Sequence, residues 1–282
     1  DIGGPTMLRS AAKNYRDVTV VVDPADYGEV LSRLADGTAD EAFRFKLMYK
    51  VFTHTAVYDS MISAFMREKL GIRYPDEIAL ALEKVQDLRY GENPHQTAAF
   101  YREPLPVANS IAYAEQLHGK ELSYNNINDA NGALELLKEF SVPAVVAVKH
   151  ANPCGVGVGE TVYDAYMKAY TADPMSVFGG IVVTNAVIDE ATAAEMHKIF
   201  LEIIVAPDFT PEAIKTLTYK KPSLRLLKLD TTHREYPEGE LDMKKVAGGR
   251  LMQQVDDKPY KNAAEWEADA AAATKDKVHK EL

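Results

Sequence analysis

The stretch AVVAVKHANPCGVGVGE (residues 144–160) passes from an apolar run into a segment rich in glycine. A continuous run of alanine and valine that ends in polar residues is typical of a strand buried on both faces of a sheet. We therefore expect a strand that ends at Lys149 and His150, then a loop, and then a helix that opens near Glu160.

The same alternation continues on both sides of this stretch. Strands of the parallel-sheet type that alternate with helices of about 10 to 15 residues predict a layered α/β domain. Thr210 followed by Pro211 predicts one further helix start. The expected helices are 129–140, 160–173, 189–200 and 262–282, and the expected strands are 143–149, 179–185, 203–207 and 223–230.

The sequence pattern of the N-terminal part, up to about residue 80, predicts a second, partial α/β domain. DVTVVVDP (17–24) has the pattern of a buried strand, and residues 25–34 have that of a helix. Thr38 and Glu41 match a capping box before a long helix. A short helix is expected over 76–86, and we place the domain boundary near residue 80.

Composition excludes several classes of protein. The 282 residues carry a formal net charge of -10, which argues against a broad nucleic-acid-binding surface. A single cysteine rules out an internal disulfide and fits a reducing cytoplasm. No apolar run approaches the ~20 residues that cross a bilayer. The chain begins in what reads as a loop entering a helix, so we expect a fragment of a longer protein.

The loop NPCGVG weakly resembles the P-C-x-x-C motif of zinc nucleobase deaminases. Those sites need two or three cysteines on one zinc ion, and Cys154 has no second cysteine to join it. The histidines also lack the His-x-x-x-His spacing of metal ligands. We therefore expect no metal here, and Cys154 is interpreted as a small packing residue.

The glycines of CGVGVGE leave two interpretations open. A glycine-rich loop between a strand and a helix presents backbone N–H groups that bind an anion. The spacing G-x-G-x-G matches neither nucleotide-binding pattern, however, and the lysine of a phosphate loop is absent. A plain strand-to-helix turn is the simpler interpretation.

Lys149 and His150 form the sharper candidate. Neighbouring strand residues point to opposite faces, so both serve one pocket only if the strand ends there. Pro153 predicts that ending, because it excludes helical backbone at Asn152. An ammonium next to an imidazole favours the neutral imidazole, which can act as a base. A solvated strand end is the alternative.

A second acid/base candidate lies at the start of the chain. Asp1 precedes Gly3 and Gly4 at a predicted helix start, and Lys13 follows about three turns later. The glycines leave room for a phosphate at the helix N-terminus, and Asp1 with Lys13 could transfer protons. Lys13 as an ordinary exposed helix residue is the alternative.

LRYGENPHQ (88–96) is the third candidate. It gathers side chains that form hydrogen bonds in a segment without apolar periodicity, which indicates ligand contact. A solvated linker between domains is the alternative. The residues concerned are Arg89, Tyr90, Asn93, His95 and Gln96.

Together these motifs resemble one enzyme family. DIGGPTMLRSAAKN, FTHTAVYDS, LRYGENPHQ, SYNNINDANGALEL, VKHANPCGVG, DPMSVFGGI and GGRLMQQ occur here in order. They are similar to the bifunctional purine-biosynthesis enzymes that combine 5-aminoimidazole-4-carboxamide ribonucleotide (AICAR) formyltransferase with IMP cyclohydrolase. The resemblance covers the chain up to about residue 266, and it implies the last two steps of de novo purine synthesis.

The resemblance implies domains and site residues. Residues 1–80 are expected to be the later part of a methylglyoxal-synthase-like, doubly wound cyclohydrolase domain. Residues 81–282 are expected to be the first, cytidine-deaminase-like, three-layer part of the transformylase. The implied catalytic residues are Lys149 and His150 for formyl transfer, and Asp1 and Lys13 for ring closure. The implied substrate-binding residues are Ile2, Gly3, Gly4, Arg89, Tyr90, His95, Asn126, Phe178, Gly179 and Glu202.

The same resemblance implies substrates and partners. 10-Formyltetrahydrofolate is the expected formyl donor, AICAR and formyl-AICAR are the nucleotides, and no metal or redox cofactor is needed. A cytoplasmic homodimer is expected. Residues that the family places before Asp1 and after residue 282 belong to the same sites, so we expect little activity from these residues alone. A catalytically inactive nucleotide- or folate-binding fragment is the alternative.

Overall fold

The computed structural model describes residues 1–236 and 240–257. The chain divides into two compact units. The N-terminal unit comprises residues 1–84 with 101–104, and the C-terminal unit comprises residues 85–100 with 105 onward.

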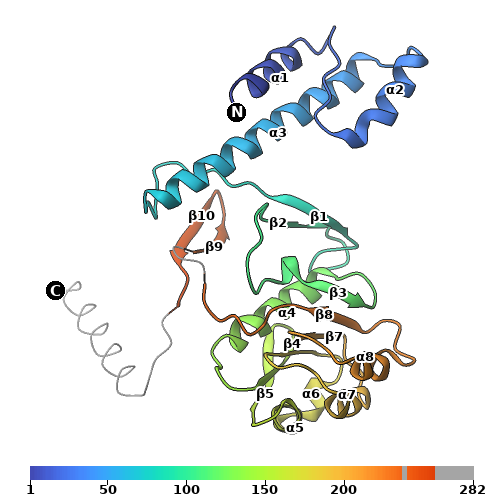
Figure 1. Cartoon of the computed structure of the whole chain (residues 1–282), viewed down its shortest axis with the longest axis vertical. Coiled ribbons are helices and arrows are strands. Elements are labelled where there is room, and N and C mark those ends of the chain that lie inside the picture. The colour runs from blue at the N-terminus through green and yellow to red at the C-terminus, as the bar shows by residue number, and fades with distance from the viewer. Residues whose placement is uncertain (237–239, 258–282) are drawn as a thin grey trace, which may run out of the picture. The chain divides into compact units, whose positions relative to one another are not determined.

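The N-terminal unit is built from helices. They are α1 (Gly3–Lys13), the short 3₁₀ helix η1 (Pro24–Asp26), α2 (Tyr27–Ala35) and the long α3 (Glu41–Lys69) (Figure 1). Val30 of α2 packs with Phe43 and Leu47 of α3 in a small buried cluster. The capping box predicted at Thr38 and Glu41 is wrong, because the side chain of Asp40 caps α3 by accepting a hydrogen bond from the N–H of Phe43 at 2.8 Å.

The strand predicted over residues 17–24 is also wrong. Residues 18–23 are not helical, but they pair with no described strand. Val21 instead packs against the cluster of Val30, Phe43 and Leu47. A β-branched run favours extended backbone, whereas a strand also needs a hydrogen-bonded neighbour.

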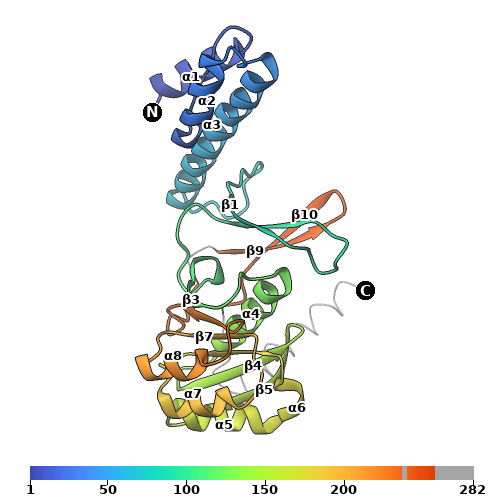
Figure 2. The ribbon, with the colours of Figure 1, turned by 90° about the vertical axis from the view of Figure 1, so that its right-hand side faces the viewer.

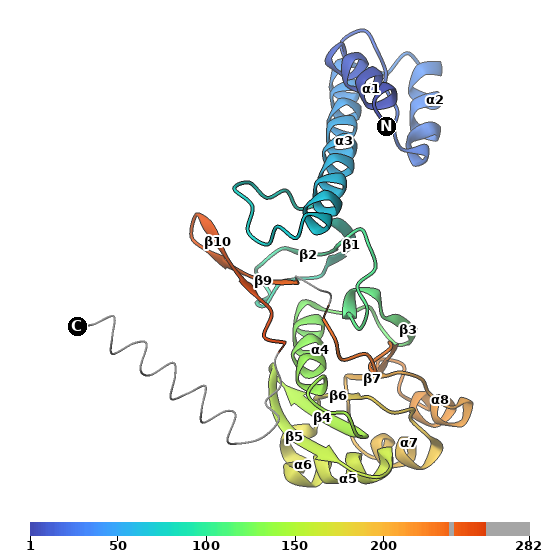
Figure 3. The ribbon, with the colours of Figure 1, turned by 60° about the vertical axis from the view of Figure 1, so that its left-hand side comes forward.

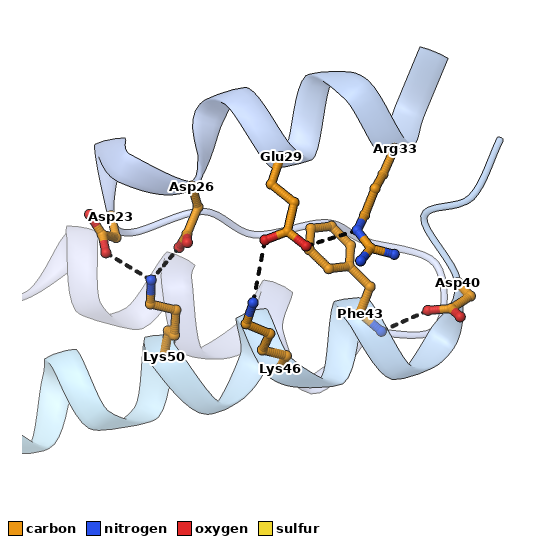
Figure 4. Close-up of polar contacts among 8 residues, drawn as sticks. All are labelled: Asp23, Asp26, Glu29, Arg33, Asp40, Phe43, Lys46 and Lys50. Atoms are coloured by element: carbon orange, nitrogen blue, oxygen red, sulfur yellow. Dashed lines mark hydrogen bonds and ion pairs between the residues drawn. The ribbon is translucent and has the colours of Figure 1, made fainter. Parts of the chain in front are cut away.

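Ion pairs join α3 to the segment that contains η1 and α2 (Figure 4). The Nζ atom of Lys50 lies 2.7 Å from Asp23 Oδ2 and 2.6 Å from Asp26 Oδ2. The hydrogen bond from Lys50 is the main reason why the pKa of Asp23 lies below its ordinary value. A second lysine, Lys46, pairs more loosely with Glu29 at 3.3 Å.

Lys50→Met is expected to raise the pKa of Asp23 toward its ordinary value and to reduce the loss of stability in acid. A carboxyl group whose pKa is lowered by folding stabilises the fold above its ordinary pKa, about 3.9. That stabilisation disappears as the pH falls through the lowered pKa. Carbon-13 NMR titration of Asp23 and thermal unfolding at several pH values measure both effects. Lys46→Met is the control, and an unchanged Asp23 pKa in Lys50→Met would contradict the assignment.

The helix predicted over residues 76–86 is wrong. Residues 76–82 form neither helix nor strand, and β1 (Glu83–Leu88) pairs with β2 (Ala98–Arg102). Pairing with a distant segment therefore overrides the local helical preference. A second two-stranded sheet joins β9 (Leu241–Val246) to β10 (Gly249–Gln254). The helix predicted over 262–282 lies outside the described residues.

A mixed sheet with the order β3-β8-β7-β6-β4-β5 forms the centre of the C-terminal unit (Figure 1). Strands β6, β7 and β8 are parallel, whereas β4 is antiparallel to both of its neighbours, β6 and β5. β3 pairs antiparallel with β8. The strands are β3 (Glu115–His118), β4 (Ala144–Lys149), β5 (Asn152–Val158), β6 (Ile181–Thr184), β7 (Ile203–Ala206) and β8 (Arg225–Lys228).

Helices cover both faces of this sheet (Figure 2). Val146 and Val148 of β4 belong to the apolar cluster on the side of α4, and Val145 and Ala147 belong to the cluster on the side of α5, α7 and α8. This alternation is the period of two expected of a strand buried on both faces. The helices are α4 (Tyr124–Leu137), α5 (Val162–Ala172), α6 (Pro174–Val177), α7 (Glu190–His197) and α8 (Pro211–Thr218), and η2 is Ile111–Tyr113. The α/β class predicted for this region is confirmed.

Candidate functional site

The stretch 144–160 forms a hairpin rather than a strand followed by a loop. β4 ends at Lys149, β5 begins at Asn152, and the two strands pair antiparallel up to Ala144 and Val158 (Figure 3). Helix α5 begins only at Val162. The glycine-rich segment is therefore an outermost strand of the sheet. Both interpretations made from the sequence, the anion-binding loop and the plain strand-to-helix turn, are wrong.

Close packing explains two of these glycines. A β-carbon added to Gly155 would lie 2.0 Å from the carbonyl oxygen of Ala169, and one added to Gly157 would lie 2.1 Å from that of Ala165. Both oxygens belong to the backbone of α5. Glycine is thus required because the helix approaches the strand more closely than any side chain permits.

The turn between β4 and β5 holds the candidate base. His150 and Ala151 have φ angles of 55° and 57°, as both central residues of a type I′ hairpin turn require. The chain thus reverses two residues before Pro153, which lies within β5 opposite Val148. The expectation that Pro153 ends the strand is wrong, although the strand does end at Lys149. His150 is exposed and Lys149 is half-buried.

Lys149 contacts the segment that follows α6. Its Nζ donates a hydrogen bond to the carbonyl oxygen of Phe178 at 2.9 Å. Gly179 has a φ of 74°, and its N–H donates to the carbonyl of Phe200 at 2.7 Å. The rings of Phe178 and Phe200 lie with their centroids 5.8 Å apart. A lysine and an exposed aromatic wall therefore lie beside each other at one edge of the sheet.

Glu202 and Asn126 continue this arrangement. The N–H of Glu202 donates to the carbonyl of Gly180 at 3.0 Å, and Asn126 Nδ2 donates to Glu202 Oε2 at 2.7 Å. Asn126 is buried, and its Oδ1 accepts the N–H of Ser123 in a capping box at the start of α4. Burial lowers the pKa of Arg225, and the charge of Glu202 partly offsets that effect.

The topology explains why these residues meet. Val148 pairs with Ile181, Ile181 with Ile203, and Ile203 with Arg225. Because β4 is antiparallel to β6, its C-terminal end lies at the same edge as the N-terminal ends of β6, β7 and β8. The structure thus brings together five residues predicted from the sequence: Lys149, Phe178, Gly179, Glu202 and Asn126. We call these five residues the edge cluster, where the edge is the one formed by the C-terminal end of β4 and the N-terminal ends of β6, β7 and β8.

Phe200 and Arg225 are neighbours of the edge cluster that sequence reasoning missed. Phe200 reaches Phe178 because β6 and β7 are parallel neighbours. The pairing of β7 with β8 places Arg225 next to Ile203, near Glu202. Neither residue stands in a local pattern that suggests a site. The order of strands in the sheet was the missing information.

Arg89, Tyr90 and His95 lie in the connection between β1 and β2. The guanidinium of Arg89 lies 5.9 Å from the centroid of the Tyr90 ring. Gln96 orders the loop by accepting hydrogen bonds at Oε1 from the N–H and the Nδ2 of Asn93. His95 is exposed. Within the described part of the chain, no hydrogen bond joins Arg89, Tyr90 or His95 to the edge cluster.

The residues predicted for ring closure lie along α1. A β-carbon on Gly4 would lie 2.3 Å from Asp1 Oδ2, so the carboxylate of Asp1 lies over the start of the helix. Ile2 precedes the helix and is exposed, and Gly3 begins it. Lys13 is at the other end of α1, about 15 Å away at a rise of 1.5 Å per residue. The structure therefore does not bring Asp1 and Lys13 together.

Cys154 packs against the cluster under α5, and its Sγ donates to the carbonyl of Ala147 at 3.4 Å. Burial raises the pKa of its thiol. This position confirms the interpretation of Cys154 as a packing residue, although Cys154 lies within β5 rather than in a turn. Residues 1–236 and 240–257 contain no group of three or more His, Cys, Asp or Glu side chains placed to hold a metal ion. The helices within the same ranges are too short or too polar to cross a membrane.

The fold and the edge cluster define an α/β protein with a polar, partly aromatic site at one edge of a mixed sheet. The model of the AICARFT/IMPCHase bienzyme family matches residues 11–282. The chain therefore belongs to this family.

Curated relatives carry the name bifunctional purine biosynthesis protein PurH. The chain is 58% identical to the protein of Acetivibrio thermocellus over 256 residues, which is 90% of this chain and 49% of the relative. It is 57% identical to that of Ruminiclostridium cellulolyticum over 255 residues, with 90% and 49% covered. For a Bacillus cereus relative the identity is 56% over 257 residues, with 91% and 50% covered. The chain thus spans about half the length of these curated relatives.

Proposed function

We propose that this chain takes part in the two reactions of the bienzyme family. These are formyl transfer from 10-formyltetrahydrofolate to AICAR and cyclisation of formyl-AICAR to IMP. The observation that carries the proposal is the edge cluster, which gathers residues from four separate segments around Lys149 and next to His150. The expected setting is a cytoplasmic homodimer that binds no nucleic acid.

We assign the two regions accordingly. Residues 1–80 are proposed to be part of a methylglyoxal-synthase-like cyclohydrolase domain, and residues 81–282 the first, cytidine-deaminase-like part of the transformylase. The mixed sheet with helices on both faces supports the second assignment. Asp1 and Lys13, together with Ile2, Gly3 and Gly4, stay predictions for ring closure.

The chemistry of formyl transfer needs a base. The 5-amino group of AICAR is a weak nucleophile because its lone pair is delocalised into the ring and the carboxamide. In the proposed step this nitrogen attacks the formyl carbon while the imidazole of His150 takes up the proton that the amine loses. The tetrahedral intermediate then collapses, the bond from the formyl carbon to N10 of the folate breaks, and N10 takes up a proton.

Lys149 is proposed to stabilise the oxyanion of that intermediate. Its ammonium has three N–H donors and uses one of them on the carbonyl of Phe178. That bond fixes the direction of the side chain, and two donors remain for a developing negative charge. Phe178 and Gly179 are proposed to form the wall of the folate site. Asn126, Glu202, Arg89, Tyr90 and His95 are proposed to contact the nucleotide.

The test makes two measurements on the purified chain. Calorimetry measures AICAR binding, and a single-turnover assay with a labelled formyl donor measures formyl transfer. In His150→Ala we expect any formyl transfer to fall by a factor of about 100 or more, while AICAR affinity changes little. Equal and measurable turnover by His150→Ala and the unaltered chain would rule out His150 as the base. AICAR binding without turnover in the unaltered chain would support a binding fragment, and absence of AICAR binding would contradict the proposal.

A further inference from the structure

The turn at residues 150–151 adopts a backbone conformation that its residues disfavour. Positive φ angles place the β-carbon close to the neighbouring carbonyl, so hairpin turns of this type usually contain Asn and Gly. Here the two positions hold histidine and alanine. Among the described residues, His150 and Ala151 are also the only consecutive pair without glycine that has positive φ. The surrounding structure must therefore stabilise the turn.

Asn152 supplies one such contact. Its Nδ2 donates a hydrogen bond to the carbonyl oxygen of His150 at 2.8 Å. This carbonyl is part of the peptide group between His150 and Ala151, so the bond fixes the orientation of that peptide plane. The same plane has to rotate when the backbone leaves the left-handed region. Asn152 also pairs with Lys149 at the first position of the hairpin, so its backbone belongs to the sheet.

Helix α4 limits the turn from the other side. A β-carbon added to Gly132 would lie 3.6 Å from the carbonyl oxygen of Ala151, which is ordinary contact distance. Ala151 therefore lies against the helix at a position without a side chain. The turn therefore lies between this helix and the side-chain amide of Asn152.

We propose that Asn152 is a positioning residue for His150, which rests on the function proposed above. The backbone of His150 sets the direction of its Cα–Cβ bond, and hence the place of the imidazole relative to Lys149. Lys149 is itself held by the carbonyl of Phe178. Asn152 thus keeps the base and the oxyanion donor in one fixed relation before substrate binds.

Asn152→Asp tests this directly, because it preserves the shape of the side chain and removes the N–H donor. Loss of one such bond is expected to shift the turn away from the left-handed conformation by about fivefold in population. The Cα and Cβ chemical shifts of His150 and Ala151 report that change in the 282-residue chain. The shift of the His150 ring signals on addition of AICAR is expected to weaken in parallel, with much of the AICAR affinity retained.

Matched variants separate positioning from general destabilisation. Asn125→Asp places the same new charge on an exposed residue of α4 and is expected to leave the turn and the ring signals unchanged. Adding Ala151→Gly to Asn152→Asp is expected to restore the turn, because glycine adopts positive φ without strain. Rescue of the AICAR response by that second change is a result that a merely structural role of Asn152 does not produce.

Two outcomes overturn different claims. If Asn152→Asp keeps both the left-handed chemical shifts and the full AICAR response, the positioning role of Asn152 is wrong, whatever the function of the site. If the unaltered chain binds AICAR without any change at the His150 ring, the proposed base is wrong and the positioning claim fails with it. In that case the backbone shifts still show whether Asn152 holds the turn.

Discussion

Gly157→Ala is expected to destabilise the C-terminal unit by about 3 kcal/mol or more, and to lower the yield of soluble protein. The added β-carbon would meet the carbonyl oxygen of Ala165 at 2.1 Å and the backbone nitrogen of Ala169 at 2.6 Å. Backbone atoms cannot rotate away as a flexible side chain can, so α5 has to move off the sheet. Denaturant unfolding followed by fluorescence and circular dichroism measures the loss.

Gly132→Ala is the matched control for that experiment. It makes the same chemical change in the same unit, but here the added β-carbon has ordinary contact distances. Since Gly132 lies within helix α4, alanine is expected to stabilise the protein by about 0.5 to 1 kcal/mol. An unfolding midpoint for Gly157→Ala equal to that of the unaltered chain would show that α5 does not approach β5 this closely.

Asn126→Asp is expected to destabilise the C-terminal unit by about 2 to 3 kcal/mol at neutral pH. The amide that now donates to Glu202 at 2.7 Å would become a carboxylate facing another carboxylate. Asn126 is 4% exposed, so water screens this repulsion poorly. The cap on the N–H of Ser123 survives, because an oxygen still occupies the position of Oδ1.

The effect of Asn126→Asp should depend on pH with a defined sign. Two facing carboxylates raise the pKa of one of them, so the folded state binds a proton that the unfolded state releases. The destabilisation is then largest at neutral pH and shrinks as the pH falls toward the ordinary carboxyl range near 4. Urea unfolding between about pH 7 and 4.5 measures this trend.

Asn128→Asp on the same helix is the control, because Asn128 is exposed and the introduced charge meets solvent. It is expected to show little pH dependence in the same range. If Asn126→Asp unfolds at the same urea concentration at both ends of that range, the hydrogen bond between Asn126 and Glu202 does not hold the edge cluster together.

The members of the candidate site were largely predictable, whereas their arrangement was not. Lys149 could be named from a local motif, and Phe178 and Glu202 could be named from the resemblance to the enzyme family. The structure places all three within one network. What could not be predicted is that β4 lies antiparallel between β5 and β6. That choice puts the end of β4 beside the start of β6, and the chemistry proposed for the candidate site depends on it.

By itself, the sequence determined the features that depend on neighbouring residues. Apolar periodicity set the α/β class and the central strands. Thr210 and Pro211 marked the start of α8, where the hydroxyl of Thr210 accepts a hydrogen bond from the N–H of Ala213, three residues further along the chain. Such interactions involve a few adjacent residues, so their pattern is visible in the chain.

Only the tertiary structure decided the features that depend on distant partners. The extended segment at 17–24 has no described strand to pair with, and residues 83–88 became a strand because they pair with 98–102. The glycines of 155–157 serve the approach of α5 rather than an anion. In each case, local preferences amount to fractions of a kcal/mol per residue, and a hydrogen-bonded or close-packed partner elsewhere in the chain outweighs them.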